Sequence, residues 1–170
     1  MPFAARLWTL ALLLSGACAC AQTVKITPLG SHAGEYCATD RAMLLEDPTG
    51  VRLLYDAGAS VAGGSDPRLG QVHVVLLSHA HGDHIGAAKA AGPNAGACAQ
   101  PQTVSALPAT NTGEIIAAKN SAIMTSADMT GFLAQKVEVL RGKPVPNCIE
   151  SGLGRDTVVP LEAPCRAPVQ

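Results

Sequence analysis

The sequence predicts a mixed α/β fold, of the α+β kind, and three observations support this prediction. A short alternating segment at 23–27 is followed by a hairpin pattern over 42–56, and an apolar run at 72–77 ends in a cluster of histidines. Segments rich in helix-forming residues come after that run. Because a sheet buries its apolar face against another layer, strands followed by helices indicate a sheet covered by helices.

The strands are predicted from periodicity and from turn residues. Residues 23–27 alternate between polar and apolar side chains, as in a half-buried strand. Two apolar segments, 42–46 and 51–55, flank the turn sequence Asp-Pro-Thr-Gly at 47–50 and therefore predict a hairpin. The nearly continuous apolar run at 72–77 predicts a strand that is buried on both faces.

Two helices are predicted further along the chain. Residues 85–91 are rich in helix formers and are followed by a Gly-Pro pair. Residues 127–141 place apolar side chains on one helical face and are followed by glycine. The remaining assignments are short strands near 103–106 and at 122–125, and one edge strand at 157–161 in the proline-rich end of the chain.

The first 21 residues have the layout of a secretory signal peptide. An apolar run at 7–14 follows a single basic residue and precedes a stretch of small residues. This run is shorter than the roughly 20 apolar residues that cross a bilayer. We therefore expect a mature domain at 22–170 that is periplasmic or secreted and has no transmembrane segment after cleavage. The alternatives are a lipoprotein anchored at Cys18 or Cys20, and a buried N-terminal helix.

Charge and cysteine content bear on partners and cross-links. The formal net charge is −1, so no strong field favours nucleic acid or an anionic membrane. Four cysteines follow the expected signal peptide, namely Cys37, Cys98, Cys148 and Cys165. In an exported protein these are expected to form disulfides, with three pairings open. A zinc site made of them is less expected, because none forms a Cys-x-x-Cys pair.

Residues 78–86, which we call the histidine loop, carry the strongest chemical signal. His79 and His81 are two apart, so in extended backbone both rings project to the same side and can reach one cation. Asp83 and His84 follow at the turn into a helix and can reach a second cation. The alternative is a polar loop whose histidines are simply exposed to solvent.

The order His-x-His-x-Asp-His after an apolar strand resembles the metallo-β-lactamase superfamily. Residues 24–30, 42–55 and 56–58 also resemble its opening strands and its first acidic motif, so the resemblance covers about residues 23–92. The resemblance implies a four-layer αββα sandwich. It also implies that Asp56 orients the histidine loop through hydrogen bonds.

The same resemblance implies a hydrolase with two divalent metal ions. His79 and His81 would bind the first ion, Asp83 and His84 the second, and Asp83 is also the expected catalytic residue. Zinc is the expected metal because histidine-rich sites favour it. Such an ion lowers the pKa of bound water from about 15.7 to about 7. The expected substrate is a small molecule with an ester, lactone, lactam or phosphodiester-type bond.

The family pattern continues with ligands that this sequence does not repeat. No histidine follows His84, although a catalytic zinc ion normally has three protein ligands and a water. We therefore expect the N-terminal half of an αββα sandwich, incomplete over 93–170. His73 is expected to be a packed strand residue, and His32 is expected near the rim of the site. The alternatives to an active hydrolase are a truncated, inactive fragment and a disulfide-stabilised metal-binding protein without enzymatic activity.

Overall fold

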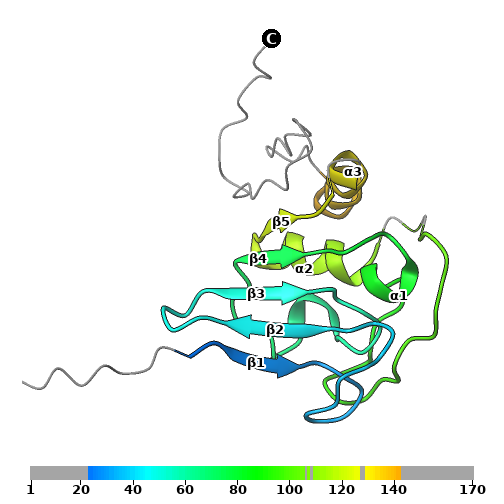
Figure 1. Cartoon of the computed structure of the whole chain (residues 1–170). Helices are drawn as coiled ribbons and strands as arrows, with labels where there is room; N and C mark the ends of the chain where they lie inside the picture. Colours follow the sequence, from blue (N-terminus) through cyan, green and yellow to red (C-terminus); the bar gives the residue numbers. More distant parts are fainter. Residues whose placement is uncertain (1–22, 106, 108, 127–128, 143–170) are drawn as a thin grey trace, which may run out of the picture.

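The computed structural model describes residues 23–105, 107, 109–126 and 129–142 (Figure 1). The strands are β1 (Lys25–Pro28), β2 (Met43–Glu46), β3 (Arg52–Tyr55), β4 (Val74–Leu76) and β5 (Ala122–Met124). The helices are η1 (Gly63–Ser65), α1 (Gly82–Ile85), α2 (Asn111–Lys119) and α3 (Thr130–Arg141). The expected signal peptide, the edge strand at 157–161, Cys148 and Cys165 lie outside these residues.

The strands form one mixed sheet in the order β1-β2-β3-β4-β5. The first three strands are antiparallel, and the predicted hairpin is confirmed by the pairing of Leu44 with Leu54. β3, β4 and β5 are parallel to one another, so the chain crosses over between them through η1 and through α1 and α2. The carboxyl ends of β3 and β4 therefore meet at the same edge of the sheet.

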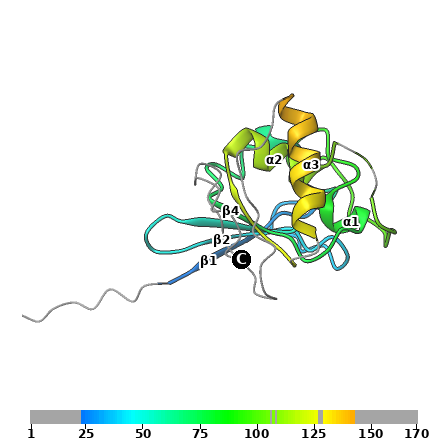
Figure 2. The ribbon, with the colours of Figure 1, turned by 90° about the horizontal axis from the view of Figure 1, so that it is seen from above.

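One face of the sheet carries the core. Leu44, Leu54, Val75 and Ile123 lie side by side across four strands and are buried. Ile115 and Ile116 of α2 and Leu133 and Val137 of α3 belong to the same apolar cluster. Figure 2 shows the three α-helices on this side of the sheet. The described residues thus form one sheet and one helix layer, as expected for an incomplete αββα sandwich, and the predicted α/β class is confirmed.

The other face of the sheet is apolar but only partly buried. Leu45, Leu53 and Val74 lie side by side on it and are half-buried, and Ile26, next in the row, is 59% exposed. The prediction that 72–77 is buried on both faces is therefore wrong for β4. Within the described residues, no helix combines the length and apolar character needed to cross a membrane.

Two helix predictions differ from the structure. α1 ends at Ile85, so the predicted helix at 85–91 is wrong. Gly86 has a left-handed φ of 76°, and the helix cannot continue through it. α2 was not predicted, because it lies in the stretch 93–120, whose many Gly, Ala, Pro and Asn residues indicate no clear element. Its start is set by Thr110, whose hydroxyl accepts a hydrogen bond from the Gly113 amide at 3.2 Å.

The remaining predictions are confirmed with small changes in bounds. β5 occupies most of the predicted strand at 122–125, and α3 ends where expected, before Gly142 in the left-handed conformation. The predicted strand near 103–106 is reduced to a single antiparallel bridge between Val104 and His81.

Candidate metal centre

The histidine loop begins at the carboxyl end of β4, and Asp56 lies at the carboxyl end of the parallel strand β3. The Asp56 amide donates to the Leu76 carbonyl at 3.0 Å, which fixes these two strand ends beside each other. Ligand sites in open α/β sheets lie at this edge because side chains and loops from neighbouring strands converge there. The topology therefore brings the acidic motif of one strand to the histidine loop of the next.

Asp56 is fully buried and accepts three hydrogen bonds from the histidine loop. Its Oδ1 accepts from the Ser78 amide at 2.9 Å, and its Oδ2 accepts from the Ser78 hydroxyl at 2.8 Å. The Nδ1 atom of His84 lies 2.6 Å from Oδ2. Because a carboxylate can only accept, this nitrogen must carry a proton, and in the neutral ring Nε2 of His84 then has the lone pair that a cation needs.

The same reasoning assigns the protonation of His79. Its Nδ1 lies 2.9 Å from the Ser78 hydroxyl, whose single proton is already donated to Asp56. The hydroxyl oxygen must therefore accept from Nδ1 of His79, which leaves Nε2 of that ring free as well. Two of the predicted ligands are thus held in the tautomer that binds metal through Nε2.

The four predicted metal ligands are neighbours, although no three of them bring ligand atoms within 4.8 Å of one another. The ring centroids of His79 and His81 are 4.5 Å apart, and those of His79 and His84 are 4.0 Å apart. The Nε2 atom of His84 lies 3.3 Å from Oδ2 of Asp83. These donors, three imidazoles and one carboxylate, are of the types that zinc takes in hydrolytic sites.

Burial around His79 favours the neutral form of its ring. Burial lowers the pKa of His79, and the neighbouring His84 and His81 lower it further. A neutral imidazole is the form that coordinates a metal ion, so little proton release is needed at this residue. His81 is exposed, and this leaves the loop open to small molecules from solvent.

Residues 98–105, which we call the bridging segment, support the histidine loop from a second side. The Gln102 amide donates to Oδ1 of Asp83 at 3.1 Å. The Gly82 amide donates to the Thr103 carbonyl, and the Ser105 amide donates to the Ala80 carbonyl, both at 2.9 Å. Sequence reasoning did not find this support, because an irregular segment that binds through its backbone leaves no pattern in its side chains.

The two upstream histidines do not join the four predicted ligands in any contact that the structure shows. His73 is exposed at the start of β4, and its Nδ1 accepts from the Arg52 amide at 3.0 Å, so the expectation of a packed side chain is wrong. The side chain of His32 is 81% exposed and contacts Ser31 and Glu35. The expectation that His32 lies near the rim of the site stays a prediction.

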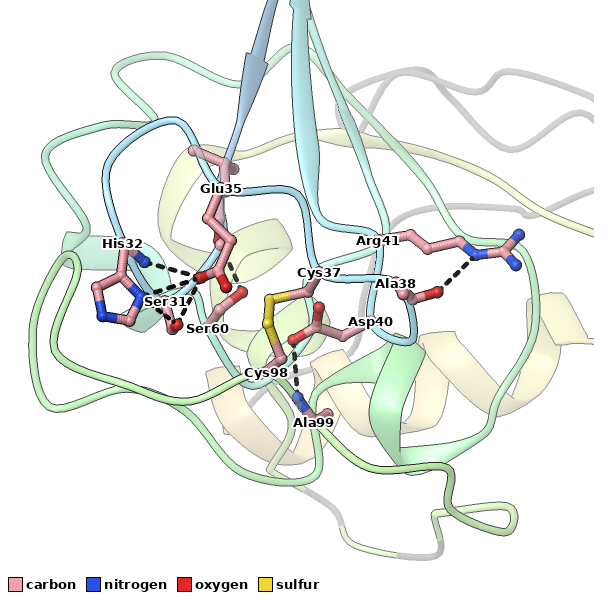
Figure 3. The surroundings of a disulfide bond; sticks show 12 residues. Ser31, His32, Glu35, Cys37, Ala38, Asp40, Arg41, Ser60, Cys98 and Ala99 are labelled. Atoms are coloured by element: carbon pink, nitrogen blue, oxygen red, sulfur yellow. Dashed lines mark hydrogen bonds and ion pairs between the residues drawn. A yellow bond between two sulfur atoms is a disulfide. The ribbon is translucent and has the colours of Figure 1, made fainter.

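A second group of ligand-type side chains lies around the disulfide (Figure 3). Glu35, Cys37 and Cys98 bring a carboxylate oxygen and two sulfur atoms within 4.8 Å of one another. Because the two sulfur atoms are bonded to each other, this group is a cross-link here and no thiolate site. The prediction of a disulfide is confirmed for Cys37 and Cys98, and Cys148 and Cys165 lie outside the described residues.

Comparison with known proteins finds a family model that matches the part of the chain holding the histidine loop. A sequence model of the metallo-beta-lactamase superfamily matches residues 41–101. This range holds Asp56, the whole histidine loop and the first part of the bridging segment. The resemblance to this superfamily is thus confirmed over residues 41–101. No curated protein and no solved structure gives a significant match to the chain.

Proposed function

We propose that this protein is an exported metal-dependent hydrolase whose histidine loop binds two divalent ions, most readily Zn²⁺. The observation that carries the proposal is the network of Asp56, Ser78 and His84, which engages Nδ1 of His79 and of His84, whose ring centroids lie 4.0 Å apart. Hydrogen bonds that orient metal ligands in this way raise the affinity of a site for its metal ion.

We assign each residue a role in metal binding from its position in or beside the histidine loop. His79 and His81 hold one ion, while Asp83 and His84 hold the other, and Asp83 in addition orients the reacting groups. Asp56 keeps the proton of His84 on Nδ1 and anchors the start of the loop through Ser78. A bound divalent ion supplies a hydroxide near neutral pH. The proposed substrate is a small molecule with an ester, lactone, lactam or phosphodiester-type bond.

A second candidate function is a disulfide-stabilised metal-binding protein without enzymatic activity. The disulfide between Cys37 and Cys98 favours it, as does the number of ligands. The described residues bring together two ligands for each ion, and a catalytic zinc ion normally takes three. Metal content and hydrolysis have to be measured on the same preparation to separate the two functions.

The test uses the mature chain, residues 22–170, loaded with Zn²⁺ and dialysed. We expect close to two equivalents by elemental analysis, and a large loss in His81→Ala. The matched control is His73→Ala, the same change at another exposed histidine, which should keep the metal. Wild-type protein without metal would contradict the proposal. Full metal content in His81→Ala would show that another group binds it.

The hydrolytic part is tested with chromogenic esters, lactones, β-lactams and phosphodiesters. Turnover that is lost in His81→Ala and kept in His73→Ala supports the hydrolase. Tight binding of metal without turnover of any of the four classes favours the second candidate. Export is tested separately, by sequencing the N-terminus of the protein recovered from the cell envelope and from the medium. A chain that still begins at Met1 would contradict it.

A further inference from the structure

The bridging segment contacts the histidine loop through a short part of its own backbone. Three hydrogen bonds and the bridge between His81 and Val104 fall within residues 102–105. One of these bonds reaches Oδ1 of Asp83, and two flank the backbone of His81. The position of the bridging segment therefore determines where two of the four proposed ligands lie.

The start of the bridging segment is fixed by the disulfide. Cys98 is its first residue, and the partner Cys37 is buried in the loop between β1 and β2. Next to the cross-link, the Ala99 amide donates to Oδ2 of the buried Asp40 at 3.4 Å. Figure 3 shows Cys37, Asp40, Cys98 and Ala99 grouped around the cross-link.

The chain between α1 and Cys98 gives this segment little support of its own. Residues 87–97 contain no helix or strand. The contacts that hold this stretch go to other parts of the chain: the Ala90 amide donates to the Val61 carbonyl at 3.2 Å, and Lys89 pairs with Glu114. The cross-link instead joins the bridging segment to a residue 61 positions away, in a loop whose two ends enter β1 and β2.

We infer that the Cys37–Cys98 disulfide is a positioning element of the metal centre: it holds the bridging segment against the histidine loop, and its reduction weakens metal binding there. The inference rests on the metal binding proposed above. Reduction by a small-molecule dithiol breaks the sulfur–sulfur bond. Two electrons and two protons pass to Cys37 and Cys98, and the dithiol becomes a disulfide. The site is thereby sensitive to the redox state of the compartment.

The first measurement needs no metal. Amide hydrogen exchange is compared between metal-free wild type and Cys37→Ser/Cys98→Ser. We expect faster exchange at the amides of Gly82, Gln102 and Ser105, which make the three hydrogen bonds. The amides of Leu44 and Leu54 in the central strands serve as the internal control and should be unchanged. Unchanged exchange at all five amides would overturn the inference, and equal acceleration at all five would show a global loss of stability instead.

The second measurement uses Co²⁺ as a spectroscopic probe of the histidine loop. Cys37→Ser/Cys98→Ser should bind Co²⁺ about 10- to 100-fold more weakly than wild type, the usual effect of losing groups that orient ligands. Its visible spectrum should also change. A variant that is less stable but keeps both the affinity and the spectrum would show that the disulfide only stabilises the fold, and would overturn the inference.

A redox experiment on the wild type replaces the variant if the variant does not fold. Exchange at Gly82, Gln102 and Ser105 should rise when a dithiol is added and fall again on reoxidation. Exchange is the right readout here, because Glu35 and the two free thiols would themselves bind Co²⁺. Oxidised wild type that binds no Co²⁺ would contradict the proposed function, while the exchange data would still decide the positioning role.

Discussion

Asp56 is fully buried, and each of its carboxylate oxygens accepts a hydrogen bond from Ser78. A buried carboxylate is costly unless it is paired, and here the compensating donors all come from the histidine loop. Its φ of 40° is uncommon for a residue other than glycine, although aspartate and asparagine adopt such values more often than other residues. The side chain of Asp56 is therefore fixed by the histidine loop, and its uncommon backbone conformation is kept so that these hydrogen bonds can form.

Asp56→Asn tests whether the Asp56 carboxylate orients the histidine loop, because asparagine tolerates the same backbone conformation. The amide replaces one accepting oxygen with a donor, so either Ser78 or His84 loses its acceptor and the network that fixes the tautomer of His84 is broken. We expect Zn²⁺ affinity to fall about 10- to 100-fold in a competition titration. The control is Asp47→Asn in the hairpin turn, which makes the same chemical change away from the loop. Equal affinities in the two variants would contradict the role of Asp56.

Asp40 predicts a pH dependence of stability. Burial raises the pKa of Asp40, and hydrogen bonds from Ala99 and Ser60 offset only part of this effect. The folded protein therefore binds the Asp40 proton more tightly than the unfolded chain. Stability from this group is fully present below the unfolded pKa, about 3.9, and is lost as the pH rises through the higher folded pKa.

Asp40→Asn should remove the loss of stability that occurs as the pH rises, because asparagine does not ionise. We expect a higher free energy of unfolding than wild type at neutral pH, and a difference that shrinks as the pH falls toward the unfolded pKa. Urea unfolding of both proteins at a series of pH values measures it. A difference that stays constant with pH would mean that the charge of Asp40 is not the cause.

At the scale of single elements, Gly86 decides where α1 ends. Its φ of 76° suits glycine, and a Cβ there would overlap the Ala57 carbonyl and the side chain of Asn111. Asn111 cannot easily move, because its amide donates to the Gly58 and Val61 carbonyls at 2.8 and 2.7 Å. The end of the helix that carries Asp83 and His84 is therefore set by contacts with residues distant in sequence.

Gly86→Ala and Gly142→Ala form a matched pair. Both glycines follow a helix in the left-handed conformation, but a Cβ at Gly142 meets nothing within 4 Å among the residues that the structure describes. Gly142→Ala should cost about 1–2 kcal/mol for the backbone alone. Gly86→Ala should cost about 1–3 kcal/mol more, as overpacking does, and should weaken Zn²⁺ binding. Thermal unfolding of both variants measures the difference, and equal losses would show that the contacts of Gly86 do not matter.

The elements that sequence predicts are those that local chemistry determines. The hairpin of β2 and β3 follows from its turn residues, and α3 follows from its apolar face and Gly142. α2 could not be predicted, since its cap on Thr110 is formed by a residue that is common in loops. The end of α1 could not be predicted either, because the contacts of Gly86 come from elsewhere in the chain.

At the scale of the whole molecule, part of the candidate site could likewise be predicted from the sequence and part could not. The four ligands lie within six residues and could be read directly from the chain, and the family resemblance added Asp56. The bridging segment acts through its backbone, and the disulfide that holds it joins residues 61 apart. The choice between three cysteine pairings depends on the folded loops, so neither feature has a local signal.

The two faces of the sheet give the last prediction, at the scale of the whole molecule. Leu54 and Leu53 are neighbours on β3 and point to opposite faces. Leu54 is fully buried under the helices, and Leu53 lies on the other apolar face, half-buried among side chains such as Leu45. The side chains on the face of Leu53 are therefore only partly removed from solvent, whereas those beside Leu54 are fully packed under the helices.

Leu54→Ala should therefore cost about 2–5 kcal/mol, the range for leucine in a closed core. Leu53→Ala should cost about 1 kcal/mol, a typical value for a substitution outside the core. Urea unfolding of the two variants at several protein concentrations gives both numbers. Because alanine at 53 removes apolar surface from the exposed row, that variant should also aggregate less than wild type. Equal losses in the two variants would mean that the second face is as closed in solution as the first.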